Sequence, residues 1–211
     1  SLPGSQQQPR AGWVVKSYHR PSAADGPADP ADIRPPAVLV ATMDFLTHCV
    51  LDSELQPLAN RHKFVRDRTR ALRQDLTYQG LPSHGRGRTR AEIDADLVCV
   101  DLHERCARFH ILSAHRLCEE STENFEPQQN MEQLDKCLIS LRSMYRDFRK
   151  SGVLSEHGLR LPNEAEFEAY FLLTHLLDEF LFYVAQVPPD VYAAAPVQRV
   201  VRAFHTLRAN N

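Results

Sequence analysis

The chain has 211 residues, 43% of them apolar and 25% charged, which is ordinary for a globular protein with a substantial hydrophobic core. No stretch approaches the roughly 18 uncharged apolar residues of a membrane span, and residues 1–9 lack the apolar segment of a signal peptide. Five cysteines, an odd number without C-x-x-C spacing, favour reduced thiols in a cytosolic or nuclear setting.

The small net charge of −2 conceals an uneven distribution. Residues 61–90 hold nine Lys/Arg against two Asp/Glu, a local net charge of +7, whereas residues 91–211 hold twelve Lys/Arg against nineteen Asp/Glu, a net charge of −7. A molecule polarised in this way can present one face to a polyanion and another to a basic protein.

Residues 1–36 contain seven prolines and three glycines, so regular helix is excluded there. We expect an N-terminal arm, either laid over the rest of the protein or left as a flexible tail. A short piece from Trp13 to Tyr18 carries the aromatic residues of this region and favours the docked alternative.

From residue 37 to residue 211 the apolar residues follow a helical period. The pattern predicts a first helix of about 16 residues around 38–50 and a second over 60–79, ended by Gly80 and Pro82. Thr89 and Glu92 form a capping box that starts a third helix, which can run to about residue 120.

A fourth helix is predicted from Pro127 to about Lys150, and a fifth from Glu164 to about Val184. The fifth is apolar on nearly every side, which predicts burial between neighbouring helices. A last helix follows Pro188 and Pro189, with its apolar stripe at residues 197–207. The predicted class is all-α, with antiparallel helical hairpins stacked as in TPR-like or PCI-type repeat arrays.

The second helix carries a basic strip. Lys63, Arg66, Arg70 and Arg73 project within an arc of about 80°, separate from the apolar sector of the same helix. A glycine-containing loop adds three more cations, Arg86, Arg88 and Arg90. These seven residues are our candidate nucleic-acid-binding set, because clustered cations bind phosphates; the alternative is a solvated face.

Arg68 and Asp75 lie inside the apolar sector of the same helix, seven residues apart. Because a buried charge needs a partner, we expect these structural polar residues to pair with each other or with neighbouring groups.

The third helix holds a possible metal site, formed by Cys99, His103, Cys106 and His110 on one face. Eleven helical residues separate its outer members by about 16 Å, too far for one ion, so the stripe is interpreted as core. The chain has no dinucleotide-binding, P-loop, zinc-protease or nucleophile-elbow motif. We therefore expect no enzyme activity, no metal and no cofactor.

Several blocks of the sequence resemble the Sac/GANP domain family, which comprises the germinal-centre-associated nuclear protein and its fungal counterparts. They are residues 32–39 (DIRPPAVL) with 42–46 (TMDFL), 64–77 (FVRDRTRALRQDLT) with Gln79, 105–110 (RCARFH) with 114–120 (AHRLCEE), 136–141 (KCLISL) through Tyr145, and 163–167 (NEAEF) with Tyr170. The resemblance covers about residues 13–211, and the block in the second helix is the most specific.

This resemblance implies a non-catalytic scaffold of the second transcription–export complex, which couples messenger-RNA production to export through nuclear pores. It implies location in the nucleus and at the nuclear envelope, a PCI-domain partner, a small acidic DSS-type peptide and RNA, with no membrane insertion. Family members continue toward a winged helix, so we expect this chain to stop before it and to lack most of the surface for the PCI partner. The alternative is an interaction module of another PCI-type assembly, such as a proteasome lid or translation factor, without nucleic-acid binding.

Overall fold

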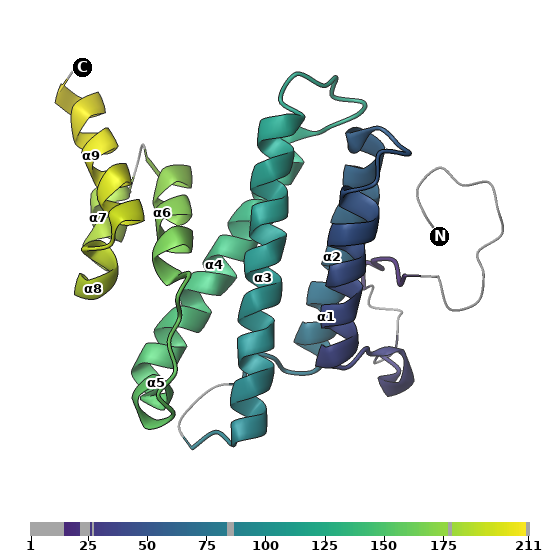
Figure 1. The fold of residues 1–211 in the computed structure, drawn as a ribbon, viewed down its shortest axis with the longest axis horizontal. Coiled ribbons are helices and arrows are strands. Elements are labelled where there is room, and N and C mark those ends of the chain that lie inside the picture. The colour runs from purple at the N-terminus through teal and green to yellow at the C-terminus, as the bar shows by residue number, and fades with distance from the viewer. Residues whose placement is uncertain (1–14, 22–25, 27, 84–86, 177–178, 210–211) are drawn as a thin grey trace. The chain divides into compact units, whose positions relative to one another are not determined.

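A computed structural model describes residues 15–21, 26, 28–83, 87–176 and 179–209 of the chain. Every regular element in these residues is a helix, which confirms the all-α class (Figure 1). The stacked-repeat arrangement stays a prediction. None of the helices within the described ranges is both long and apolar enough to cross a membrane. The chain divides into two compact units, residues 1–83 with 88–131 and residues 84–87 with 132–211, which are described separately.

The first unit is built on three helical segments that lie side by side (Figure 1). A 3-10 turn, η1 (Pro30–Asp32), precedes α1 (Pro36–Asp44), which continues as a π-helical segment, η2 (Phe45–Leu51). α2 (Leu58–Tyr78) and α3 (Arg90–Arg116) follow. These bounds agree with the predicted first three helices to within a few residues. The buried residues between the helices include Leu39, Leu46, Val65, Leu72, Ile93 and Leu102.

The two helix ends that flank the loop before α3 are set by local chemistry. Gly80 has φ +67°, and Gly80 N and Leu81 N donate to the carbonyls of Thr77 and Leu76 at 3.0 Å each. This left-handed glycine closes α2, where a side chain would be strained. Thr89 begins α3 with the predicted capping box, in which its hydroxyl and the Glu92 carboxylate satisfy each other's backbone N–H groups.

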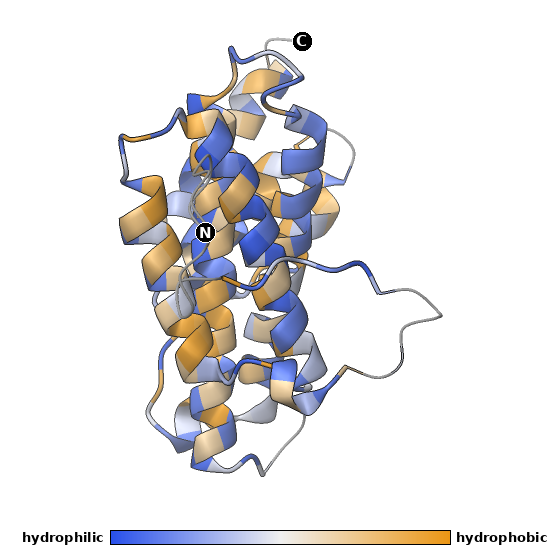
Figure 2. Ribbon diagram, turned by 90° about the vertical axis from the view of Figure 1, so that its right-hand side faces the viewer, coloured by the Kyte–Doolittle hydropathy of each residue, from blue (hydrophilic) through white to orange (hydrophobic). Residues whose placement is uncertain are grey.

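The second unit contains most of α4 (Pro127–Ser151), then α5 (Val153–Glu156), α6 (Glu164–Thr174), α7 (Phe180–Val184), α8 (Pro189–Tyr192) and α9 (Ala195–Ala209). α6 packs on α9 around a core that includes Leu172, Phe180, Val197, Val200 and Phe204. Figure 2 shows hydrophobic and hydrophilic residues alternating around the helices, as expected when each helix buries one face.

The predicted fifth helix over 164–184 is wrong as a continuous element. α6 ends at Thr174, and α7 starts at Phe180. The Thr174 hydroxyl and His175 Nδ1 both bond to the carbonyl of Phe171, at 2.9 Å each. The Phe171 carbonyl is therefore bonded to side chains at the end of α6. Full burial is wrong as well, because Leu173, Leu181 and Phe182 are 45%, 53% and 64% exposed.

Candidate nucleic-acid interface

The α2 strip, defined as Lys63, Arg66, Arg70 and Arg73, lies on one side of α2, away from the buried Val65 and Leu72. Lys63 is exposed, and its Nζ donates to the carbonyl of Glu123 at 2.8 Å. The other three side chains are half-buried. Burial lowers the pKa of Arg66, and the neighbouring charge of Arg70 lowers it further. Arg66 Nε is buried and has no hydrogen-bond acceptor among the residues that the structure describes.

An N-terminal segment covers part of this strip. In the arm segment, defined as residues 15–21, the ring of Tyr18 stacks on the guanidinium of Arg70 at 3.9 Å from its centroid. Two hydrogen bonds attach the backbone of the segment to α2: Tyr18 N–H donates to Asp67 Oδ2 at 3.2 Å, and Gln74 Nε2 donates to the carbonyl of His19 at 2.9 Å. The segment therefore docks on α2, whereas Trp13 lies outside the described residues.

Asp75 anchors the same segment. Its carboxylate is fully buried and accepts from Lys16 Nζ at 2.7 Å, from Arg34 Nε at 2.7 Å and from Arg34 N at 3.3 Å. Lys16 Nζ also donates to the carbonyl of Asp32 at 2.9 Å. The Asp75 carboxylate of α2 thus binds both the arm and the segment that leads into α1. These neighbouring cations supply the partners that a buried charge needs.

Arg68 and Asp75 follow the second of the two expected alternatives, pairing with neighbouring groups. The Arg68 side chain is 17% exposed, pairs with the adjacent Asp67 and lies over the Phe64 ring at 4.4 Å. Arg68 and Asp75 do not pair with each other, since Lys16 and Arg34 occupy the Asp75 carboxylate. A long side chain near the edge of an apolar sector can reach a surface partner, which a helical projection does not represent.

The loop before α3 contributes less to the interface than predicted. Arg86 lies outside the described residues, and Arg90 is exposed but pairs with Asp94 at 2.9 Å. Arg88 is buried: its Nη1 donates to Asp96 Oδ2 at 2.8 Å and to the carbonyl of Ser83 at 3.1 Å. Arg88 therefore holds the loop against α3 and is removed from the predicted phosphate-binding set.

The Cys/His stripe of α3 lies in the core, as interpreted from the sequence. Cys99, Cys106 and His110 have no exposed surface, and His103 is 8% exposed. His103 Nδ1 bonds to the carbonyl of Cys99, and His110 Nδ1 to Asn130 Oδ1, at 2.8 Å each. Burial lowers the pKa of His103 to about 4 and of His110 to about 3. In the described part of the chain, no three His, Cys, Asp or Glu side chains converge as metal ligands.

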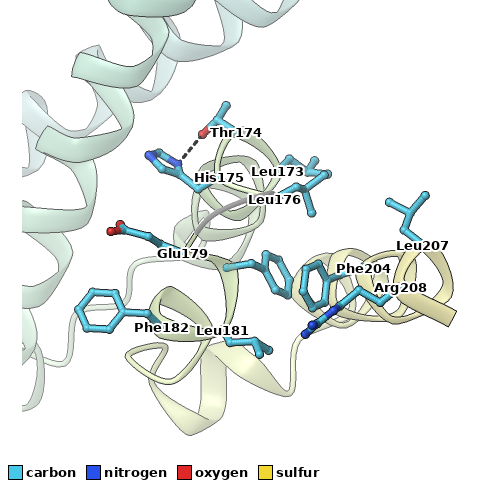
Figure 3. A pocket seen from close by; sticks show the side chains of 11 residues that line it. Leu173, Thr174, His175, Leu176, Glu179, Leu181, Phe182, Phe204, Leu207 and Arg208 are labelled. Carbon is cyan, nitrogen blue, oxygen red and sulfur yellow. Dashed lines mark hydrogen bonds between the residues drawn. The ribbon is translucent and has the colours of Figure 1, made fainter. Parts of the chain in front are cut away.

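The second unit carries an apolar groove of about 1230 Å³, which the sequence pattern did not reveal (Figure 3). At its centre the Phe204 ring stacks on Phe180, with ring centroids 4.0 Å apart. Leu207, 56% exposed, and Arg208 project from the same helix as Phe204. Its lining residues come from both sides of the break after Thr174 and from α9, and apolar periodicity does not show this break.

Two contributors to the α2 surface were also missed by sequence reasoning, namely Lys16 and Arg34. Both lie outside the helical region, so no periodic pattern marks them. The aromatic residues from Trp13 to Tyr18 were the indication that this part of the arm has a docking position, and Tyr18 occupies one.

Known proteins are similar in sequence to this chain over most of its length. A model of the SAC3/GANP family matches residues 2–211. SAC3 family protein 1 of Schizosaccharomyces pombe is 39% identical over 200 residues, which are 94% of this chain and 17% of that protein. Protein xmas of Drosophila melanogaster is 34% identical over 215 residues, 99% of this chain and 9% of that protein. SAC3 family protein B of Arabidopsis thaliana is 29% identical over 178 residues, 82% of this chain and 9% of that protein.

The chain thus spans less than a fifth of the length of these relatives. The sequence blocks that resemble the family fall largely in α1, α2, α3, α4 and α6. They include Asp75, the three arginines of the α2 strip, and Cys106 and His110 of the buried stripe of α3. With the family model matching nearly every residue, the resemblance is confirmed: the chain belongs to the SAC3/GANP family.

Proposed function

We propose that this chain is a non-catalytic scaffold segment of a nuclear messenger-RNA export assembly, the second transcription–export complex, and that its α2 strip contacts RNA. Membership of the SAC3/GANP family over residues 2–211 is the observation that carries the scaffold role. The RNA contact is supported by the α2 strip, in which four cations share one side of a single helix.

Phosphate is the ligand chemistry that suits this strip. Lys63 is exposed and the three arginines are half-buried along one side of α2, and guanidinium and ammonium groups form charge-assisted hydrogen bonds with phosphate oxygens. Because the strip consists of cations, we expect binding to be electrostatic and largely indifferent to RNA sequence.

The proposed assembly also includes protein partners: a PCI-domain subunit, a small acidic DSS-type peptide and components of the nuclear pore. The groove beside α9 supports protein contact in general, because exposed apolar side chains such as Leu181, Phe182 and Leu207 are stabilised by burial against another polypeptide segment. We place the assembly in the nucleus and at its envelope, as the family resemblance implies.

The RNA contact is tested by reversing Arg66, Arg70 and Arg73 to Glu and titrating single-stranded RNA at several salt concentrations. We expect weaker binding and a slope of log affinity against log salt that is shallower by up to about 2, since each lost phosphate contact removes about 0.7. The matched control reverses Arg160, Arg199 and Arg202, which are exposed residues of the second unit, and so makes the same change in net charge.

Both variants are first shown to unfold like the wild type. Unchanged affinity and slope in the folded α2 variant, or an equal loss in the control, contradict an RNA contact at the α2 strip. The protein-interaction alternative, a module of another PCI-type assembly without nucleic-acid binding, is then the function to test.

A further inference from the structure

We infer that the guanidinium of Arg70 is a stacking site for an unpaired RNA base, and that Tyr18 of the arm segment occupies this site when RNA is absent. The inference rests on the proposed RNA contact and goes further, because it names the part of RNA that binds Arg70 and the group that it displaces. In this proposal the arm segment covers Arg70 until an RNA base displaces Tyr18.

The geometry of the Tyr18 contact is that of a stacked ligand. The Arg70 guanidinium carbon lies 3.9 Å from the ring centroid, close to the contact distance of two planar groups. A guanidinium plane is a general platform for nucleic-acid bases, since every base has a π face and stacking does not depend on base identity. The ring of Tyr18 thus takes the place on Arg70 that a base of single-stranded RNA takes in our proposal.

The surroundings of Arg70 provide for the phosphates that accompany a base. Arg66 lies one helical turn away on the same side of α2 and is half-buried. Lys63 lies almost one further turn along and is exposed. One stacking guanidinium followed by two cations along a helix is suited to one base and the backbone next to it.

The contacts of the arm segment near Tyr18 are of a kind that a ligand can replace. Tyr18 itself is attached by one amide hydrogen bond to Asp67 and by the stack on Arg70. The other attachments of the segment, the Lys16–Asp75 ion pair and the bond from Gln74 to the His19 carbonyl, lie outside Tyr18. Lifting Tyr18 therefore leaves the arm tethered through Lys16.

The decisive variant is Tyr18→Ala, which removes the ring and keeps the Lys16 anchor. Its affinity is measured for a ten-nucleotide oligouridine and for an abasic oligomer with the same number of phosphates. We expect oligouridine to bind roughly three- to tenfold more tightly than it binds the wild type, the size of a competing cation–π contact, and the abasic oligomer to gain less. Tyr192→Ala, at an exposed tyrosine of α8, is the matched control and leaves both affinities unchanged.

Arg70→Lys separates stacking from charge, because an ammonium keeps the positive charge but offers no planar surface. In the Tyr18→Ala/Arg70→Lys double variant we expect the gain for oligouridine to disappear. A second readout follows the wild-type protein alone: hydrogen exchange at the Tyr18 amide, which donates to Asp67, speeds up when oligouridine is added.

The outcomes separate this inference from the proposed function. Weaker oligouridine binding by Tyr18→Ala means that the ring completes the site, and unchanged binding means that it covers nothing; both overturn the inference. An equal gain for the two oligomers overturns the base-stacking site. None of these results touches the proposed RNA contact, which stands or falls with the Arg66, Arg70 and Arg73 reversal.

Discussion

Asp75 holds the N-terminal arm and the start of α1 to α2, and its replacement tests the architecture of the first unit. Asp75→Asn keeps the size of the side chain but removes the charge that faces Lys16 Nζ and Arg34 Nε, each 2.7 Å away. Removing one partner of a buried ion pair costs about 3–5 kcal/mol, because the remaining charge stays desolvated.

The two cations do not contribute equally to this cost. The Lys16 side chain is 32% exposed and can turn to water, so its share is that of a surface pair, below about 1 kcal/mol. Arg34 is 15% exposed, and its Nη1 and Nη2 atoms are buried without a hydrogen-bond partner among the described residues. Since Arg34 has little other compensation, we expect Asp75→Asn to lower the free energy of unfolding by about 3 kcal/mol.

Urea unfolding followed by circular dichroism measures the effect. With a slope of about 2 kcal/mol per molar urea, the loss moves the midpoint down by about 1.5 M. Arg68→Ala is the comparison on the same helix. Arg68 pairs with the sequence neighbour Asp67 and lies over the Phe64 ring, so its loss is about 1 kcal/mol. If Asp75→Asn costs less than 1 kcal/mol, or no more than Arg68→Ala, the buried carboxylate is not the anchor that we describe.

Three further predictions concern the buried polar groups. Burial lowers the pKa of His110 to about 3. As the pH decreases from about 6.5, His110 is protonated in the unfolded chain but stays neutral in the folded protein, so the free energy of unfolding decreases as the pH decreases. In urea titrations at pH 6 and pH 4, His110→Gln should therefore lose about 1.4 kcal/mol less per pH unit than the wild type; equal slopes contradict this. Arg142→Leu leaves the buried Glu168 without the guanidinium that lies 2.8 Å from its carboxylate, and should lower the free energy of unfolding by about 3 kcal/mol in the same assay. Adding Glu168→Leu to this variant should restore part of that loss. Burial raises the pKa of Cys99 to about 12, which disfavours the thiolate that zinc requires, so elemental analysis of the reduced protein should find no stoichiometric zinc; one zinc per chain, lost in Cys106→Ser, would reverse this interpretation.

Much of the secondary structure follows from local sequence. The capping box at Thr89 and Glu92 and the left-handed Gly80 act within a few residues, so the sequence contains all the information that they need. The break after Thr174 is different. At that helix end the Thr174 and His175 side chains both bond to the carbonyl of Phe171, and an apolar pattern that runs through the break gives no indication of it.

The candidate interface was predictable only in part. The angular position of the α2 strip follows from helical geometry, which fixes where successive side chains point. Whether each cation is accessible does not follow, because this depends on segments distant in sequence: Arg88 is buried against Asp96, and Arg70 lies beneath Tyr18, 52 residues earlier in the chain.

The all-α class, the start of α3 and the family were predictable from the sequence, because helix periodicity, capping and motif identity are properties of short stretches of chain. The ion-pair partners were not predictable in this way. Asp75 binds Lys16 and Arg34 rather than Arg68, and the arm segment lies on the α2 strip. The physical reason is that an ion pair depends on distance and desolvation in space, and folding brings together cations and carboxylates that no local pattern connects.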